Sequence, residues 1–204
     1  MALGNEAENF LIVPSVAPAP RTQIVIGLTG EIGTGKTTLA EYLRFKHGFE
    51  SLRYSQIIQR LYSCDNGRST LQVVGSSIAK KPESQRQLSL EIIKEIENHP
   101  EKNYVVDGLR HMIDFNTLSE HFGNRFTMFA IESTFANKFR RYNKRSVEPV
   151  SKEEFQAILS NEAEQDIMLL TMLCYTDQHI ITNNKTFKSY FASVELKLRE
   201  LLCP

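Results

Sequence analysis

A glycine-rich run between an apolar strand and a helix constrains this chain more than any other feature. The run, Gly30-Glu-Ile-Gly-Thr-Gly-Lys-Thr37, fits the pattern G-x-x-x-x-G-K-[S/T]. A β-branched segment at 24–28 precedes it, and apolar residues at helical spacing follow it from 36 to 45. Its glycines permit tight turns that turn backbone N–H groups toward an anion, and the helix start adds the positive end of its dipole. The sequence therefore predicts a loop that binds the phosphates of a nucleoside triphosphate.

Individual positions of this loop have distinct expected roles. Lys36 is expected to span the β- and γ-phosphates, and the hydroxyl of Thr37 to bind Mg²⁺. The full set of residues expected to contact ATP is Gly30, Ile32, Gly33, Thr34, Gly35, Lys36, Thr37 and Thr38. The alternative is a glycine-rich turn between strand and helix that holds no nucleotide.

Strand-like and helix-like segments alternate along the rest of the chain. Strands are predicted at 24–28, 49–53, 104–106, 126–131 and 179–181, with helical periodicity between them. Such alternation predicts an α/β protein in which a parallel sheet lies between two layers of helices. Ser69 is expected to cap a helix after a loop at 64–69. Ser151 and Glu154 form a capping box that predicts one helix running to Cys174.

Residues 1–21 differ in composition from the segments that follow. Pro14, Pro18 and Pro20 stand among small residues and favour extended chain. We predict a flexible leader at 1–21 before a domain at 22–204. The alternative is that residues 10–12 dock on a neighbouring surface.

Charge and cysteine content limit the classes of partner. Lys plus Arg and Asp plus Glu number 24 each, so the net charge favours neither nucleic acid nor a membrane surface. The apolar stretches are shorter than the roughly 20 residues that span a bilayer. The three cysteines, Cys64, Cys174 and Cys203, lie far apart, which is typical of reduced thiols in the cytoplasm. We expect a cytoplasmic protein that binds no nucleic acid and no membrane; monomer and homodimer both stay open.

A carboxylate follows the predicted strand at 104–106. A phosphate loop needs an acid at the end of a neighbouring strand to hold the magnesium ion or its water, and Asp107 occupies such a position. We predict that Asp107 and Thr37 are the metal ligands. The alternative is that Asp107 only caps the next helix. Arg110, three residues later, is a candidate for binding an acceptor phosphate, against the alternative of a solvated arginine.

The segment 138–145 contains five cations in eight residues. Arg141 and Arg145 share a helical face at i, i+4, and Arg140 lies beside them. A kinase needs cations that close over the transferring phosphoryl group and stabilise charge in its transition state. We predict this role for the segment; a solvated basic face and a nucleic-acid patch are the alternatives.

Several of these segments resemble one group of P-loop kinases. The segment 26–40 resembles the opening of dephospho-CoA kinases, archaeal adenylate-kinase-like proteins and deoxynucleoside monophosphate kinases. Val105-Val-Asp-Gly-Leu-Arg110 is similar to a strand end of the latter two, and 139–145 to their lid entrance. Glu153-Glu-Phe155, Glu164 and 176–183 resemble their C-terminal third, in which Asn183 would lie in the adenine-binding loop; a plain loop is the alternative.

This resemblance covers about residues 23 to 202 and implies a P-loop NTPase fold of the nucleotide-kinase type. The implied architecture is a three-layer α/β/α sandwich with a five-stranded parallel sheet, a mobile acceptor region near 54–97 and a lid near 140–152. The implied reaction is γ-phosphoryl transfer from ATP, with Mg²⁺, to a small-molecule nucleotide acceptor.

The chain departs from the group at three places. Dephospho-CoA kinases carry an Asp after the second strand as a candidate base, whereas 52–56 read Leu-Arg-Tyr-Ser-Gln. Ser55, Gln56 and Arg60 instead suggest hydrogen bonds to an acceptor that is already a phosphate and needs no strong base. The segment 69–81 lacks an arginine expected after its glycine, and the lid lacks an Asp-rich stretch after Arg145.

Three functions follow from these patterns. The leading one is an ATP-dependent phosphotransferase acting on a nucleoside monophosphate or similar nucleotide. The alternatives are a dephospho-CoA kinase and a catalytically weak nucleotide-binding regulatory module. The predicted catalytic residues are Lys36, Asp107, Arg110, Arg141 and Arg145, with Arg141 and Asn183 also contacting ATP.

Overall fold

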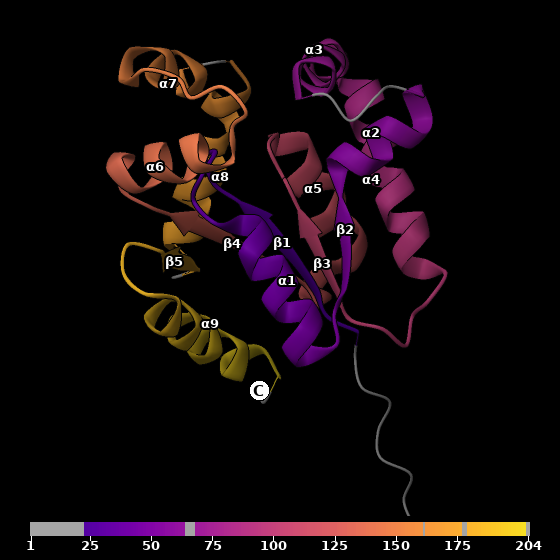
Figure 1. Ribbon diagram of the computed structural model, residues 1–204. Coiled ribbons are helices and arrows are strands. Elements are labelled where there is room, and N and C mark those ends of the chain that lie inside the picture. Colours follow the sequence, from indigo (N-terminus) through magenta and orange to yellow (C-terminus); the bar gives the residue numbers. More distant parts are fainter. Residues whose placement is uncertain (1–22, 64–67, 161, 177–178, 203–204) are drawn as a thin grey trace, which may run out of the picture.

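A five-stranded parallel sheet forms the centre of the chain in a computed structural model that describes residues 23–63, 68–160, 162–176 and 179–202 (Figure 1). The strands are β1 (Val25–Thr29), β2 (Glu50–Arg53), β3 (Tyr104–Asp107), β4 (Phe126–Glu132) and β5 (Ile180–Thr182). Their order is β2-β3-β1-β4-β5, and every neighbouring pair is parallel. The prediction of an α/β fold with a five-stranded parallel sheet is confirmed.

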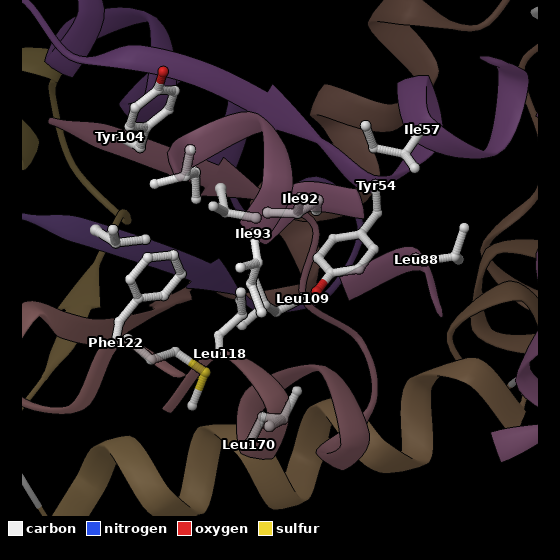
Figure 2. Close-up of a cluster of buried hydrophobic side chains, with 14 of the residues drawn as sticks. Tyr54, Ile57, Leu88, Ile92, Ile93, Tyr104, Leu109, Leu118, Phe122 and Leu170 are labelled. Atoms are coloured by element: carbon white, nitrogen blue, oxygen red, sulfur yellow. The ribbon is translucent and has the colours of Figure 1, made fainter. Parts of the chain in front are cut away.

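Helices cover both faces of the sheet because successive strand residues point to opposite sides. One face of the sheet packs against α1 (Lys36–His47) and α9 (Phe187–Leu202) through Ile26, Leu28, Val105, Phe129, Leu39, Leu43, Tyr190 and Val194. The other packs against α4 (Pro82–Glu97), α5 (Met112–Phe122) and α8 (Glu162–Thr176) through Val25, Val106, Met128, Leu88, Ile92, Leu118 and Leu170. Figure 2 shows the second of these cores. A short 3₁₀ helix, η1 (Gly123–Arg125), leads into β4.

Two further pairs of helices lie beyond the edge where the strands end. Helices α2 (Tyr54–Tyr62) and α3 (Arg68–Ala79) follow β2, and α6 (Phe135–Arg145) and α7 (Lys152–Leu159) follow β4. In Figure 1, α3 and α7 stand at the same end of the molecule, above opposite sides of the sheet. The range 54–97, expected as an acceptor region, contains α2, α3 and also α4 (Pro82–Glu97), and the range 140–152, expected as a lid, runs from α6 to the start of α7. The functions of both ranges stay predictions.

The predicted single helix from Ser151 to Cys174 is wrong in its length. The capping box at Ser151 and Glu154 is present, but the helix ends at Leu159 and α8 begins at Glu162. The two helices pack in different places, since Phe155 belongs to a small apolar cluster of α6 and α7 whereas Leu170 packs against the sheet. The helix expected after the loop at 64–69 is α3, and the predicted cap at Ser69 concerns a side chain outside the described part of the chain.

Some predictions concern residues outside the described ranges. These are the leader at 1–21, the loop residues 64–67 and the thiols of Cys64 and Cys203. The thiol of Cys174 is buried and donates a hydrogen bond of 3.4 Å to the carbonyl oxygen of Met128. Within the described ranges, no helix combines the length and the apolar character that crossing a membrane requires.

Candidate phosphate-binding site

The glycine-rich loop connects β1 to α1 in a conformation that depends on its glycines. Gly33 and Gly35 have φ values of +84° and +108°, a region that residues with side chains rarely adopt. A Cβ at Gly33 would lie 2.7 Å from the carbonyl oxygen of Lys138, and one at Gly35 would lie 2.4 Å from Nδ2 of Asn183. The loop is therefore packed closely between α6 and the segment after β5.

Lys36 reaches back across this loop. Its Nζ donates hydrogen bonds to the carbonyl oxygens of Gly30, at 2.5 Å, and Glu31, at 3.0 Å. Helix α1 begins at Lys36, and among the described residues no side chain caps its first turn and no acidic residue belongs to it. The N–H groups at the start of the helix and the ammonium group together suit an anion, because both present positive charge to the loop.

Asp107 and Thr37 meet at the end of the sheet. The register of β1 and β3 places Leu28 beside Asp107, so the acid lies next to the start of the loop. Oγ1 of Thr37 donates a hydrogen bond of 2.9 Å to Oδ2 of Asp107, whose residue is only 7% exposed. A hydroxyl and a carboxylate are oxygen ligands of the kind that Mg²⁺ prefers, and the ion usually completes its shell with water and substrate phosphates. The pair therefore fits a magnesium site.

A cation that the sequence did not single out lies beside this pair. Nε of Arg53, the last residue of β2, is 3.8 Å from Oδ2 of Asp107. The register of β2 and β3 places Arg53 directly opposite Asp107. The end of the second strand, in the region 52–56 that lacks an acid, thus places a positive charge near the carboxylate.

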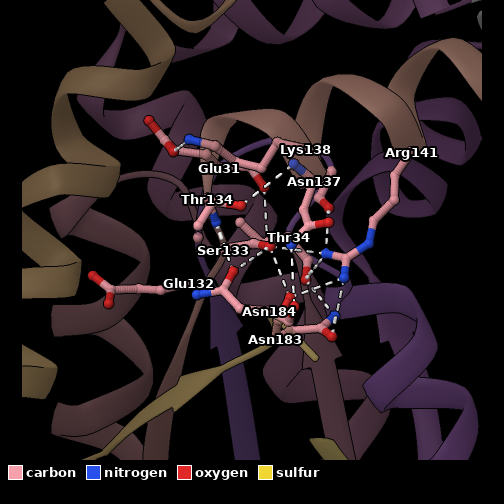
Figure 3. Close-up of polar contacts among 12 residues, drawn as sticks. Glu31, Thr34, Glu132, Ser133, Thr134, Asn137, Lys138, Arg141, Asn183 and Asn184 are labelled. Atoms are coloured by element: carbon pink, nitrogen blue, oxygen red, sulfur yellow. Dashed lines mark hydrogen bonds and ion pairs between the residues drawn. The ribbon is translucent and has the colours of Figure 1, made fainter. Parts of the chain in front are cut away.

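The guanidinium group of Arg141 forms hydrogen bonds with oxygen atoms of the protein itself (Figure 3). Its guanidinium donates hydrogen bonds of 2.9 to 3.3 Å to the carbonyl oxygens of Gly33, Thr34 and Asn183, and to side-chain oxygens of Ser133 and Asn183. Partial burial, followed by the charge of Arg140, lowers the pKa of Arg141 from its ordinary value. The side chain therefore joins the phosphate loop to the segment after β5.

Asn183 completes this junction. Its Nδ2 donates a hydrogen bond of 2.8 Å to the carbonyl oxygen of Thr34, and its side chain is buried. The hydroxyl of Tyr190 in α9 donates to the carbonyl oxygen of Gly35 at 3.2 Å, and burial raises the pKa of that hydroxyl, so it stays protonated. The structure thus places Asn183 and Tyr190 against the phosphate loop, and the contact of Asn183 with ATP stays a prediction.

Helix α6 is held against the loop by a second contact, which the sequence analysis missed. Nζ of Lys138, in a nearly buried side chain, forms an ion pair with the carboxylate of Glu31. Ile32 packs against the apolar cluster of α6 and α7 that is built on Tyr142, Phe155 and Leu159. Glu31 and Ile32 fall on the variable positions of the motif, so the pattern carried no signal for these roles.

The remaining predicted arginines are placed differently. Arg145 and Arg140 are exposed on α6, where they bond within the helix to the carbonyl oxygen of Arg141 and to the side chain of Asn137. Arg110 is half-buried in the segment between β3 and α5. Arg60 forms an ion pair of 2.9 Å with Glu95 of α4, so it ties α2 to that helix.

A buried polar network fixes the segment that carries Arg110. Asp114, on the first turn of α5, accepts hydrogen bonds from the backbone N–H groups of Arg110 and His111 and from the side chains of Gln85 and Ser89. Burial raises the pKa of Asp114, whereas the hydrogen bond from Gln85 acts against this. The side-chain oxygens of Tyr54 and Ser89 lie 2.9 Å apart, so the network also reaches α2.

The sheet order and the loop–carboxylate pair together define a P-loop nucleoside-triphosphate-binding protein with the three-layer architecture of the small kinases. A protein-family model described as an AAA domain matches residues 26–167. The match spans most of the chain, so the chain belongs to this AAA domain family. No curated protein matches the chain.

Solved structures with the same fold include several kinases. Shikimate kinase from Acinetobacter baumannii, in complex with shikimate, has a TM-score of 0.50 at 16% identity, covering 89% of this chain and 94% of its own. A gluconokinase from Sinorhizobium meliloti 1021 has a TM-score of 0.54 at 12% identity, with coverages of 89% and 95%. An uncharacterized protein from Eubacterium ventriosum has a TM-score of 0.58 at 13% identity, with coverages of 87% and 99%. At these identities the likeness concerns the fold.

Proposed function

We propose that this protein is an ATP-dependent phosphotransferase acting on a nucleoside monophosphate or a similar nucleotide. The hydrogen bond between Thr37 and Asp107 carries the proposal, because it joins the phosphate loop to the strand-end acid that phosphoryl transfer with Mg²⁺ requires. Two solved structures with the same fold are named as a shikimate kinase and a gluconokinase, and these names support a small-molecule acceptor. The proposed kinase domain is 22–204, preceded by the leader at 1–21, and its proposed location is the cytoplasm.

The charges around Asp107 favour an acceptor that carries a phosphate. Arg53 lies at the carboxylate, and Arg110 follows three residues later on a segment that Asp114 holds in place. Guanidinium groups match phosphate oxygens in geometry and in charge. An uncharged alcohol would instead need a carboxylate base, and the end of β2 supplies a cation in that position. This arrangement favours a monophosphate over dephospho-CoA as the acceptor of the new phosphoryl group.

The proposed reaction needs little chemistry from the protein beyond positioning and charge. An anionic oxygen of the acceptor phosphate forms a bond to the γ-phosphorus of ATP, while the bond from that phosphorus to the bridging oxygen breaks and ADP leaves with the electron pair. Lys36 and the N–H groups of the loop hold the β- and γ-phosphates. When bound through Thr37 and Asp107, Mg²⁺ would neutralise charge on the phosphate oxygens. No proton is removed, so no general base is required.

The test is an assay of ADP formation with ATP, Mg²⁺ and a panel of ribo- and deoxyribonucleoside monophosphates and dephospho-CoA. We expect turnover with at least one monophosphate, and a loss of at least about 100-fold in Lys36→Ala. Lys94→Ala, which removes an exposed cation of α4, should keep wild-type activity. ATP binding without turnover of any monophosphate would reject this function and leave the regulatory module; turnover of dephospho-CoA alone would favour that kinase instead.

A further inference from the structure

The ion pair between Arg53 and Asp107 affects the binding of Mg²⁺ to that carboxylate. Asp107 is the carboxylate that fits Mg²⁺, yet its Oδ2 already accepts a hydrogen bond from Thr37 and lies 3.8 Å from Nε of Arg53. A divalent cation and a guanidinium at the same carboxylate repel one another, and this repulsion is strong where the carboxylate is shielded from water. Metal binding at Asp107 and the observed position of Arg53 therefore oppose each other.

The two side chains differ in their freedom to move. The side chain of Asp107 is 8% exposed and is held by Thr37, whereas that of Arg53 is 35% exposed at the edge strand β2. Gly108 follows Asp107, and a Cβ added there would meet no described atom within 4 Å. The side chain of Arg53 borders solvent, so it can turn away from Asp107 while the carboxylate stays in place.

We propose that Arg53 is an acceptor sensor that controls metal binding at Asp107. Without an acceptor, its guanidinium neutralises the carboxylate and weakens the binding of the metal–nucleotide complex. A phosphate on the acceptor draws the guanidinium to itself, because it offers two or more negative oxygens in place of one shared carboxylate oxygen. Asp107 is then free for the metal. This inference rests on the proposed function for the identity of the acceptor site.

Two properties follow from such coupling. Acceptor phosphate and metal–nucleotide must strengthen each other's binding by the same factor, since the coupling free energy is reciprocal. Hydrolysis of ATP by water is suppressed in the absence of acceptor, because the metal-bound complex is then scarce. An uncharged nucleoside cannot displace Arg53, so it leaves the site in its low-affinity state.

The test measures binding in the absence of turnover. The affinity for Mn²⁺ in the presence of the β,γ-imido analogue of ATP is measured by electron paramagnetic resonance, with and without inorganic phosphate, AMP, CMP, GMP or dTMP. The corresponding nucleosides serve as uncharged controls. We expect at least one phosphate compound to raise the wild-type Mn²⁺ affinity by about 5-fold or more, the lower end of typical allosteric couplings. The nucleosides should have no effect.

Variants separate Arg53 from the rest of the site. Arg53→Gln should bind Mn²⁺ tightly without acceptor and lose the response to phosphate compounds, whereas Arg53→Lys should keep part of the response. Arg86→Gln, which removes an exposed arginine of α4 paired with Glu120, should behave as wild type. Thermal unfolding of each variant shows that it is folded.

Each result decides between the two proposals. An unchanged Mn²⁺ affinity in Arg53→Gln, or a wild-type affinity that no phosphate compound raises, overturns the sensor. Coupling without turnover in the kinase assay supports the sensor and rejects the proposed kinase function. Turnover of a monophosphate without coupling supports the kinase and rejects the sensor.

Discussion

Replacing Arg141 tests whether this residue joins the phosphate loop to the segment after β5 or stabilises the transition state of phosphoryl transfer. The sequence predicts that this arginine stabilises charge on the transferring group, whereas the structure uses its guanidinium to join the phosphate loop to Asn183. Arg141→Lys keeps the charge but not the planar fork that serves several acceptors at once. Arg141→Met removes all of the donors.

The expected loss of stability follows from the oxygen atoms that lose their hydrogen-bond donor when Arg141 is replaced. A hydrogen bond to a charged group contributes about 1.5–3 kcal/mol, but the acceptors here are only partly buried and regain some water. We therefore expect Arg141→Met to lower the free energy of unfolding by about 2–4 kcal/mol in total. For a chain of this length, that corresponds to a fall of about 5–15 °C in Tm. Arg141→Lys should lose roughly half as much.

The assay combines thermal unfolding, calorimetric ATP binding and steady-state kinetics. As a junction, Arg141 should affect stability and ATP affinity together, so KM for ATP rises while kcat at saturating ATP changes less than about 3-fold in Arg141→Lys. Arg140→Lys, next to it on α6 and bonded to Asn137, is the matched control and should change neither quantity. Wild-type stability and ATP affinity together with a loss of about 100-fold in kcat would refute the junction and support the transition-state role.

Three further changes test other parts of the structure. Gly35→Ala should weaken ATP binding by about tenfold or more in calorimetry, because φ is +108° and the new Cβ would lie 2.4 Å from Asn183; wild-type affinity would contradict the close packing of the loop. Asp107→Asn should reduce Mg²⁺-dependent turnover by about 100-fold while ATP binding in EDTA stays within about 3-fold, and a metal response equal to wild type would exclude Asp107 as a ligand. Glu195→Gln tests the acid stability of the contact between α1 and α9. The hydrogen bond from Tyr42 is the main reason that the pKa of Glu195 falls from 4.5 to about 2. Because the folded pKa is depressed, this stabilisation is present above about pH 4.5 and disappears as the pH falls toward 2. After allowance for solvent screening, urea unfolding should show that Glu195→Gln loses about 1 kcal/mol at pH 7 and little at pH 2.5; an equal loss at both values would refute the linkage.

The sequence by itself determined the features that depend on local backbone chemistry. The glycines of 30–37, the lysine and threonine at its end and the apolar runs around it predict the strand, the loop and the helix, because turn geometry and periodicity are properties of neighbouring residues. The position of Asp107 beside the loop could also be predicted from the sequence, because the carboxyl ends of parallel strands meet at one edge of the sheet.

Tertiary structure alone decided which side chains meet across the sheet edge. Arg53 opposes Asp107 through the register of two strands, and Lys138 reaches Glu31 because α6 packs against the loop at Gly33. The sequence shows that Arg141 is positively charged, but the same charge would suit a phosphate or the carbonyl oxygens that it contacts in the structure. Such partners come from distant segments, so charge and spacing along the chain predict that a cation is near the site but not which oxygen it binds. The phosphate loop is thus a property of the sequence, and the arrangement of cations around it is a property of the fold.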